Sequence, residues 1–553
     1  MYTMSLPAES SSFGFNKYSI SARESGKKAL LKPEIGKERE TKYPARIVDI
    51  GTTSLKILNP MGNGSDSSGW LDYKREKIES NTDTVVSIID STWFEDQLLG
   101  TDRIAKPTGT NQEAIVVTGR SSNLVVRHPN GKALIIDSVT AQISNEQKAI
   151  IQKYLGMLDI RESSALAMLL ALKNNPEIIT QYFGAYIPFE SLHITTMLGL
   201  VAELITHKEL PIPPDEKKSF YGGVIPKNDN NLDRLYACYN TLFYNGRLQS
   251  QNKLKFMENR NTENIYVIND TPAEVGFLTQ LRDIGVFPTD AMGFATDSWL
   301  KVGLFDPDES YQYRSMPIFA SMNHHWVRPL FGLLSEEEKN AVHTQSDSSR
   351  AHNHYRLAER ASIRGLFDMG KNPYMFMPVG ETGRLFKKNS NGLVEISLRS
   401  LNDLRGTLPD VLDAVVAIEQ GIIYGGRYLA ERFAKEYGKT VHDVVLYGAL
   451  ANIDPNFAEL CATCWPGVSF SVLELSNGGE AAASMWRAQQ AKAEGTEKDF
   501  KEQLFAEWKD KIQPGIYSIE HPHICWEGEK CPEDIAYEQW RNIYTQTQNT
   551  TSC

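Results

Sequence analysis

The sequence has no long apolar run, few cysteines and no excess of positive charge, and each absence excludes a class of protein. No segment approaches the roughly 18 consecutive apolar residues that a membrane-spanning helix needs. Six cysteines in 553 residues are too few for a disulfide framework, which favours a reduced, cytoplasmic setting. The formal net charge of -11 argues against nucleic acid as the main partner, because binding phosphate backbones requires clustered Lys and Arg. We therefore expect a cytoplasmic protein that binds neither membrane nor nucleic acid.

The composition that remains is that of a globular protein. Hydrophobic residues make up 41% of the chain, which is ample for a buried core. Residues 1–44 are rich in Ser, Lys and Glu without an apolar period, and we expect a poorly ordered arm there. From Arg46 to about residue 137, runs such as "RIVDI" and "AIVVTG" predict strands. Helical patterns follow to about residue 260, and "SALAMLLALK" and "LHITTMLGLVAELI" are both predicted to be core helices.

The second half of the chain repeats this order of elements. "AMGFATDSWLKVGLF" predicts a strand, a turn and a strand, and "LPDVLDAVVAIEQGIIYGGRYLAERFAKEYG" predicts a long helix. A strand, "DVVLYGAL", and a helix, "NFAELCATCWP", come next. The repeated order indicates two similar α/β domains, followed by a charged, helical tail from about residue 487.

The segment "IVDIGTTSLKIL" predicts a tight hairpin suited to phosphate. Gly51 lacks a Cβ, so its backbone can approach a ligand closely. Asp49 at the strand end can hold Mg²⁺ directly or through waters, and Lys56 can reach a terminal phosphate. Amides and hydroxyls that can donate to phosphate oxygens come from Thr52, Thr53 and Ser54. The alternative is an ordinary hairpin with a polar turn.

A second hairpin of related composition, "GFATDSWLKVG", lies in the second half and contains Gly293, Thr296, Asp297 and Ser298. Two such hairpins can clamp the β- and γ-phosphates of a nucleotide between two lobes.

Taken together, the ordered motifs resemble the carbohydrate kinases of the FGGY type, within the actin-like ATPase superfamily. The resemblance covers about Ala45 to Arg487 and is carried by "VDIGTTSLKIL", "VINDTPAEVGF", "DAMGFATDSWLKVG", "YMFMPVGETGRLF", "LYGALANIDPNFAELCATCWPGVSF" and "SNGGEAAASMWRAQ". It implies an α/β fold with two actin-like (ribonuclease H-like) domains flanking a deep nucleotide and substrate cleft. The implied domains are residues 45–283 and 284–490, with a C-terminal helical extension at residues 491–553.

The resemblance also implies a role for Asp270, which falls where the family has its catalytic aspartate. There it would accept a proton from the attacking sugar hydroxyl. The alternative is purely structural, because an aspartate before Thr-Pro is a good helix cap.

The cofactors implied are ATP and Mg²⁺, and the resemblance places several residues around the nucleotide. Thr296 is expected to donate to a phosphate, whereas a negative charge at Asp297 is unusual at this place in the family. Expected contacts with adenine, ribose and the far edge of the site come from Gly448, Ala449, Asn452, Gly478 and Gly479. Ala449 stands where the family usually has a second glycine.

The largest departure concerns the acceptor. Family members commonly carry Trp, Asp and Arg at alternate positions after the "NG" hairpin, where this chain reads Ser138, Thr140 and Gln142. A strand presenting these three side chains can still hydrogen-bond a polyol. The identity of the acceptor therefore cannot be inherited from any family member.

A cluster near the C-terminus offers metal ligands: His521, His523, Cys525 and Cys531. Its spacing matches no standard zinc pattern, and Cys461 and Cys464 fall on a predicted helix, so a structural role is favoured over a metal site.

Two functions follow from the sequence. The first is an ATP-dependent phosphotransferase that moves the γ-phosphate to a hydroxyl of a small carbohydrate or polyol. The alternative, motivated by the altered acceptor strand and Ala449, is a catalytically degenerate nucleotide- or sugar-binding regulatory protein of the same fold. A homo-oligomer is compatible with both, and the sequence leaves the oligomeric state open.

Overall fold

Two sheets of the same design organise the chain in the computed structural model. The residues that the structure describes are 45–51, 54–58, 70–81, 84–99, 114–119, 124–128, 132–140, 143–155, 165–188, 193–206, 237–243, 245–247, 265–286, 288, 290–296, 300–305, 311–315, 326–342, 353–367, 372–378, 383–390, 392–396, 401, 406–454, 456–475, 478–516 and 532–551.

The first sheet combines three parallel strands with an antiparallel hairpin. Its order is β10-β6-β1-β2-β3, where β1, β6 and β10 are parallel and β2 and β3 run antiparallel beside β1. The bounds are β1 (Ala45–Ile50), β2 (Ser54–Leu58), β3 (Trp70–Asp72), β6 (Ala114–Gly119) and β10 (Ile265–Asn269). The parallel strands read as continuous apolar runs because both of their faces are covered.

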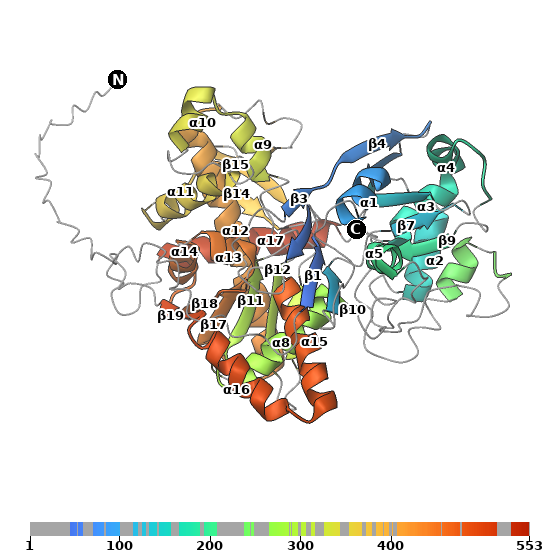
Figure 1. The fold of residues 1–553 in the computed structure, drawn as a ribbon. Coiled ribbons are helices and arrows are strands. Elements are labelled where there is room, and N and C mark those ends of the chain that lie inside the picture. Colours follow the sequence, from blue (N-terminus) through green and yellow to red (C-terminus); the bar gives the residue numbers. More distant parts are fainter. Residues whose placement is uncertain are drawn as a thin grey trace, which may run out of the picture. The chain divides into compact units, whose positions relative to one another are not determined.

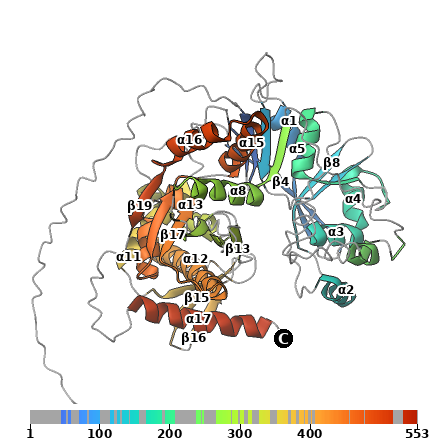
Figure 2. The same cartoon turned by 90° about the horizontal axis from the view of Figure 1, so that it is seen from below.

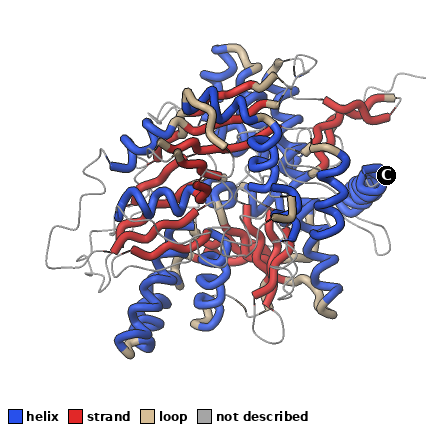
Figure 3. The backbone as a smooth tube through the Cα atoms, turned by 90° about the vertical axis from the view of Figure 1, so that its right-hand side faces the viewer, coloured by secondary structure: helices blue, strands red, loops and turns tan. Residues whose placement is uncertain are grey.

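The second sheet repeats this arrangement and adds one edge strand. Its order is β13-β12-β11-β17-β18-β19, with β11, β17 and β18 parallel and the other three antiparallel to their neighbours. The bounds are β11 (Met292–Thr296), β12 (Leu300–Phe305), β13 (Tyr311–Ser315), β17 (Asp443–Tyr447), β18 (Ser469–Leu473) and β19 (Ile512–Ile516). Figure 3 shows these strands in red with helices in blue packed alongside them.

The two strand orders confirm the predicted fold class. In each sheet the first strand lies at the centre, a meander of two strands extends to one side, and two parallel strands extend to the other. That is the ribonuclease H-like order, present twice as the repeated sequence pattern predicts. The domain boundaries at 283 and 490 stay predictions, since residues 43–553 cluster as one unit.

An antiparallel sheet is inserted into the first half, in the order β4-β5-β8-β7-β9. Its strands are β4 (Arg75–Glu79), β5 (Val85–Ile89), β7 (Leu124–Arg127), β8 (Ala133–Thr140) and β9 (His193–Thr196). Its helices are α1 (Ser91–Leu99), α2 (Asn145–Leu155), α3 (Ala165–Asn174), α4 (Pro176–Phe183) and α5 (Met197–Thr206). Side chains of this sheet, of α1 and α5 and of β1 and β2 share one apolar core.

One helix prediction was wrong at its beginning. In "LHITTMLGLVAELI" the helix α5 begins only at Met197, and the preceding residues form β9. Ile194, Thr195 and Thr196 are β-branched and pair with β7, which suits an extended backbone better than a helix.

The second half carries most of the helices and a small meander, β14-β15-β16. The strands are β14 (Tyr374–Met377), β15 (Arg384–Asn389) and β16 (Gly392–Ile396). The helices are α9 (Arg328–Gly332), α10 (Glu336–Val342), α11 (Asn353–Phe367), α12 (Leu408–Glu436), α13 (Ala449–Ile453), α14 (Phe457–Cys464) and α17 (Pro532–Thr551). The long helix α12 is buried along most of its length, and Trp540 of α17 packs into the same core.

Two helices join the sheets of the two halves. α8 (Asp270–Asp283) follows β10, α15 (Gly478–Glu494) follows β18, and α16 (Glu497–Trp508) continues the chain. Phe277 and Leu281 of α8, Trp486 of α15 and Trp508 of α16 form one core with apolar residues of both sheets. Figures 1 and 2 show α8 beside α15, so the predicted C-terminal extension contributes to this central core.

A polar cluster lies inside the core around α12. The Glu419 carboxyl is fully buried, and its Oε2 lies 3.0 Å from the Ser362 hydroxyl of α11. The same hydroxyl contacts the carboxylate of Asp454, the residue after α13. Burial, with Asp454 as a second cause, raises the pKa of Glu419 well above its ordinary value.

Across the described residues, no helix is long and apolar enough to cross a membrane.

The approach of α12 to β14 generates a stability prediction. A Cβ at Gly421 would lie 2.4 Å from the Phe376 carbonyl oxygen, whereas one at Gly332 would meet nothing within 4 Å. We expect Gly421→Ala to destabilise the protein by about 2–3 kcal/mol, because the backbone contact has no room to yield. Gly332→Ala should leave stability unchanged or raise it by less than about 1 kcal/mol. Urea unfolding measures both, and equal midpoints for the two variants would contradict the prediction.

Candidate active site

The three parallel strands of the first sheet end together and bring their polar residues to one edge. Asp49 of β1 is in register with Thr118 of β6, and Thr118 is in register with Ile268 of β10. Asp270 begins α8 directly after β10. β1 and β10 flank β6, so they lie two strand spacings apart, about 10 Å. The carboxyl edge of a parallel sheet is the usual place for a ligand site in α/β proteins.

A glycine allows these strand ends to meet closely. Gly119, the last residue of β6, has a φ of +131°, and a Cβ there would lie 2.2 Å from the Ile50 carbonyl oxygen. Only glycine fits this close approach to β1.

The predicted phosphate hairpin is present, and its two charged residues pair with each other. Asp49 and Lys56 are opposite one another in the β1–β2 ladder, and Nζ of Lys56 lies 3.2 Å from Oδ2 of Asp49. The turn is closed by a hydrogen bond from the Gly51 amide to the Ser54 carbonyl, at 3.0 Å. Ser54 is buried, and Thr52 and Thr53 lie outside the described residues. The single buried carboxylate suits Mg²⁺, which takes few carboxylates and keeps several waters.

Tyr73 holds this hairpin from the other side. Its hydroxyl donates to the Gly51 carbonyl at 3.0 Å, and its buried ring packs edge-on against Trp93 of α1. Sequence reasoning missed Tyr73, because nothing in the motif pointed to a residue 22 positions further along the chain.

Asp270 is the first residue of α8 and half-buried, with Asn269 at the cap position. A Cβ at Gly478 would lie 3.4 Å from the Asp270 Cβ, so the first turn of α15 meets the first turn of α8. Gly479, the next residue of α15, is buried. Helix N-termini favour negative charge, and two of them adjoin at this aspartate.

The second sheet also ends in polar and glycine residues, but several of them are engaged within the protein. The Thr296 hydroxyl donates to the Tyr447 carbonyl at 2.8 Å and accepts from the Ala451 amide at 3.1 Å. The hydroxyl hydrogen of Thr296 is therefore used within the protein. A phosphate at this position would have to accept its hydrogen bond from a backbone amide instead. Asp297 lies outside the described residues.

The segment predicted to contact adenosine begins directly after β17, and hydrogen bonds tie it to the end of β18. Gly448 has a φ of +99°, and its amide donates to the Leu475 carbonyl at 2.9 Å. The Asn452 side-chain amide lies within hydrogen-bond distance of three carbonyl oxygens, those of Gly448, Leu473 and Leu475. Asn452 therefore fixes this segment from within α13, whose cap position is held by Gly448. Ala449 is the first residue of α13.

A buried ion pair joins the two halves near this edge. Lys301 of β12 and Glu274 of α8 lie 2.9 Å apart, and both side chains are nearly inaccessible. Gly276 of α8 leaves room for Met485 of α15, since a Cβ there would lie 2.5 Å from the methionine sulfur. Neither contact was predicted, because each joins residues of different halves.

The strand predicted to bind the acceptor also carries a charged residue, Asp137, that the sequence analysis did not consider. Ser138 and Thr140 lie on β8, where Ser87 faces Ser138, and a register shift follows so that Ile88 faces Ile136. Asp137 is the extra residue of this bulge, and its Oδ2 lies 2.9 Å from Nε of Arg75. A charged pair therefore lies beside Ser138, with its anion on β8 and its cation on β4. Thr140 is exposed, and Gln142 lies outside the described residues.

The Arg75–Asp137 pair is connected to the predicted phosphate hairpin through Tyr73. The guanidinium of Arg75 lies 5.3 Å from the ring centre of Tyr73, the residue that holds the Gly51 carbonyl. Arg75 and Asp137 are therefore the charged residues of the inserted sheet that Tyr73 links to the hairpin.

The cysteine–histidine cluster at 521–531 lies outside the described residues. Cys461 and Cys464 are buried free thiols of α14, and no group of three metal-binding side chains occurs among the residues described.

Two ribonuclease H-like sheets in one chain define an actin-like fold. No family model and no curated protein matches the sequence. Among solved structures, the chain is similar to gluconate kinase from Lactobacillus acidophilus, with 15% identity and a TM-score of 0.47 over 92% of this chain and 98% of that chain.

Two further structures are similar over the same extent. Xylulose kinase from Lactobacillus acidophilus has 13% identity and a TM-score of 0.49, covering 92% of this chain and 99% of that chain. Glycerol kinase from Plasmodium falciparum, solved with ADP, has 12% identity and a TM-score of 0.49, covering 91% and 98%. The fold follows from the strand order and register of the two sheets.

The first turn of α15 holds a titratable group that the sequence did not reveal. Burial raises the pKa of Glu480 to about 7, against a smaller opposing effect of Lys511. The charge of Lys56 also acts on Glu480, which places this carboxyl within the electrostatic reach of the phosphate hairpin.

The raised pKa of Glu480 predicts a pH-dependent stability. Because the folded pKa exceeds the unfolded value, the protonated carboxyl favours folding at low pH, and this contribution is lost as the pH rises through about 7. Glu480→Gln should remove this pH-dependent loss of unfolding free energy. The loss is at most on the order of 3 kcal/mol between pH 5 and 8. Urea unfolding across that range measures it.

A matched control is Glu502→Gln, since Glu502 is an exposed glutamate on α16. Glu502→Gln should keep the wild-type pH slope, and an unchanged slope in Glu480→Gln would contradict the assignment.

Proposed function

We propose that the protein is an ATP-dependent phosphotransferase that moves the γ-phosphate of ATP to a hydroxyl of a small carbohydrate or polyol. The observation that carries the proposal is the position of Asp270. It begins α8 at the edge that also holds Asp49 and Gly51, and it lies against Gly478 at the beginning of α15. A carboxylate between the ends of two sheets of this fold is suited to face both an acceptor and a nucleotide.

In this proposal Asp270 accepts the proton of the attacking hydroxyl as it meets the γ-phosphorus. The two helix N-termini that adjoin at Asp270 place partial positive charge beside its side chain. The closed turn at Gly51 presents backbone amides to phosphate oxygens, and Lys56 offers a cation at the same edge. Phosphoryl transfer depends chiefly on such positioning and charge stabilisation.

Asp49 is the residue that would hold Mg²⁺, through one carboxylate oxygen or through waters. When bound, the ion would neutralise charge on the β- and γ-phosphates. The Lys56 ammonium now beside Asp49 would then be free to turn toward phosphate.

The acceptor would be bound by the inserted sheet. Ser138 and Thr140 offer hydroxyls, and Asp137 and Arg75 offer an acceptor and a donor of charge-assisted hydrogen bonds. A polyhydroxylated molecule suits this mixture of groups, which can accept and donate in turn.

The alternative is a nucleotide- or sugar-binding regulatory protein that has lost transfer. It is favoured by the internal engagement of Thr296 and by the Asp49–Lys56 pair, because both withhold groups from phosphate. Calorimetry with ATP, combined with a product assay over a panel of acceptors, separates the two. Nucleotide binding without any phosphorylated product supports the alternative.

The role of Asp270 can be measured directly. We expect Asp270→Asn to lower kcat by about 10²–10⁴-fold, because a general base typically contributes that much. Asp283→Asn, at the exposed end of the same helix, is the control and should retain full activity. ATP consumption with a panel of sugars and polyols measures both, and full activity of Asp270→Asn would overturn the assignment.

The acceptor site generates a separate prediction. Asp137→Asn should raise the KM for the acceptor by about tenfold through loss of a charged hydrogen bond, while the KM for ATP stays constant. Glu79→Gln changes an exposed carboxylate on β4, the strand of Arg75, and should alter neither constant. Equal rises in both KM values would show a general loss of structure and contradict the role of Asp137 in acceptor binding.

A further inference from the structure

A cavity of about 290 Å³ lies in the second half of the chain, between α12, the β14–β15 hairpin and α17. None of its lining residues belongs to the carboxyl edges of the two sheets or to α8, α13 or α15. Its volume equals that of about ten liquid waters, at the small end of ligand sites. The cavity is therefore distinct from the candidate active site and suits a small molecule.

Part of the wall is fixed by contacts within the protein. The Trp540 indole N–H donates to the Phe376 carbonyl at 2.8 Å, and its ring centre lies 5.9 Å from that of Tyr424. The Asn372 amide donates to the Asp413 carbonyl at 2.8 Å and accepts from the Tyr374 amide at 2.9 Å. These groups form a rigid wall with an aromatic face, and Asn372 is already satisfied.

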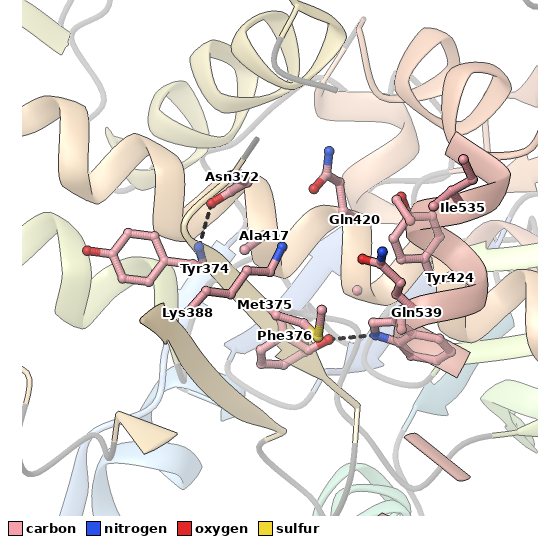
Figure 4. A pocket seen from close by; sticks show the side chains of 13 residues that line it. Asn372, Tyr374, Met375, Phe376, Lys388, Ala417, Gln420, Tyr424, Ile535 and Gln539 are labelled. Carbon is pink, nitrogen blue, oxygen red and sulfur yellow. Dashed lines mark hydrogen bonds between the residues drawn. The ribbon is translucent and has the colours of Figure 1, made fainter. Parts of the chain in front are cut away.

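Three other polar side chains line the cavity, those of Lys388, Gln420 and Gln539. Among the residues that the structure describes, no carboxylate pairs with the Lys388 ammonium, and no protein group hydrogen-bonds the side chains of Gln420 or Gln539. Figure 4 shows these three side chains around one space, from β15, α12 and α17 respectively. Three separate elements thus direct a cation and two amides into one cavity.

The one positive charge of the cavity lining has no negative counterpart in that lining. No Asp or Glu is among the lining residues, whose only charged member is Lys388. Burial lowers the pKa of Lys388 from its ordinary value, because a half-buried ammonium loses water without gaining an anion. A bound anion would supply the missing partner.

We propose that this cavity is a binding site for a small anionic polyhydroxylated molecule of the sugar-phosphate class. The anionic group pairs with Lys388, and Gln420 and Gln539 each donate to and accept from hydroxyls. The inference does not depend on the proposed phosphotransferase activity, because it concerns other residues.

A site-resolved experiment tests this proposal on the full chain, with glucose 6-phosphate as the probe. The protein is acetylated at neutral pH with and without the probe, and labelling of each lysine is followed by peptide mass spectrometry. At a probe concentration ten times its Kd, labelling of Lys388 should slow by about tenfold through mass action. Lys387, the neighbour on β15 whose ammonium lies over the Tyr374 ring, should be labelled at an unchanged rate.

Two controls make the result specific. Glucose, which has the hydroxyls but no anionic group, should give no protection. Gln420→Leu should weaken protection of Lys388 by about tenfold, whereas Gln503→Leu, on the exposed surface of α16, should leave it unchanged. Unprotected Lys388 at millimolar glucose 6-phosphate, or equal protection of Lys387 and Lys388, would overturn the proposal. Binding of the probe at the active site alone would leave Lys388 unprotected and count against it as well.

Discussion

The close packing of α8 against α15 is the constraint on which the site depends. α8 follows the last parallel strand of the first sheet, and α15 follows the last parallel strand of the second. Gly276 allows Met485 to approach, and the Ser484 hydroxyl donates to the Gln280 side chain at 3.1 Å. Because both helices begin at the carboxyl edge of their sheet, pressing them together also presses the two edges together. Asp270 meets Gly478 for this reason, and any substitution that separates the helices would separate Asp270 from the end of the second sheet.

Much of the fold could be predicted from the sequence because its cause is local. Short, largely apolar runs marked β1, β6, β11 and β17, and the 29-residue α12 was visible within one long periodic segment. The strand β18 was not predicted. The repeated order of elements led to the two-sheet design. β9 was missed because four residues are too few for a period, and their strand conformation depends on pairing with β7, about 70 residues earlier in the sequence.

The site was less predictable, for a different physical reason. Motifs gave the residue types, and the structure places Asp49 and Gly51 at the end of β1 and Asp270 beside Gly478. A motif does not say which partner a side chain will choose, so the hydrogen bonds of Thr296 and Asn452 to nearby carbonyl oxygens could not be foreseen. The pair of Asp137 with Arg75 depends on a bulge in one strand and a cation on another. Lys301 lies on β12 and Glu274 lies on α8, so only the tertiary fold brings this ion pair together.

The buried cluster around Ser362 has a consequence for the chemistry of folding itself. A hydroxyl has one hydrogen, yet this one faces a carboxyl oxygen of both Glu419 and Asp454. It can donate to only one of them, so the second carboxyl can bond to this hydroxyl only by carrying a hydrogen and donating it. Burial raises the pKa of Glu419, so that carboxyl binds its proton more tightly in the folded chain than in the unfolded one. Folding of this half is therefore linked to proton uptake at Glu419, and the buffer takes part in the equilibrium.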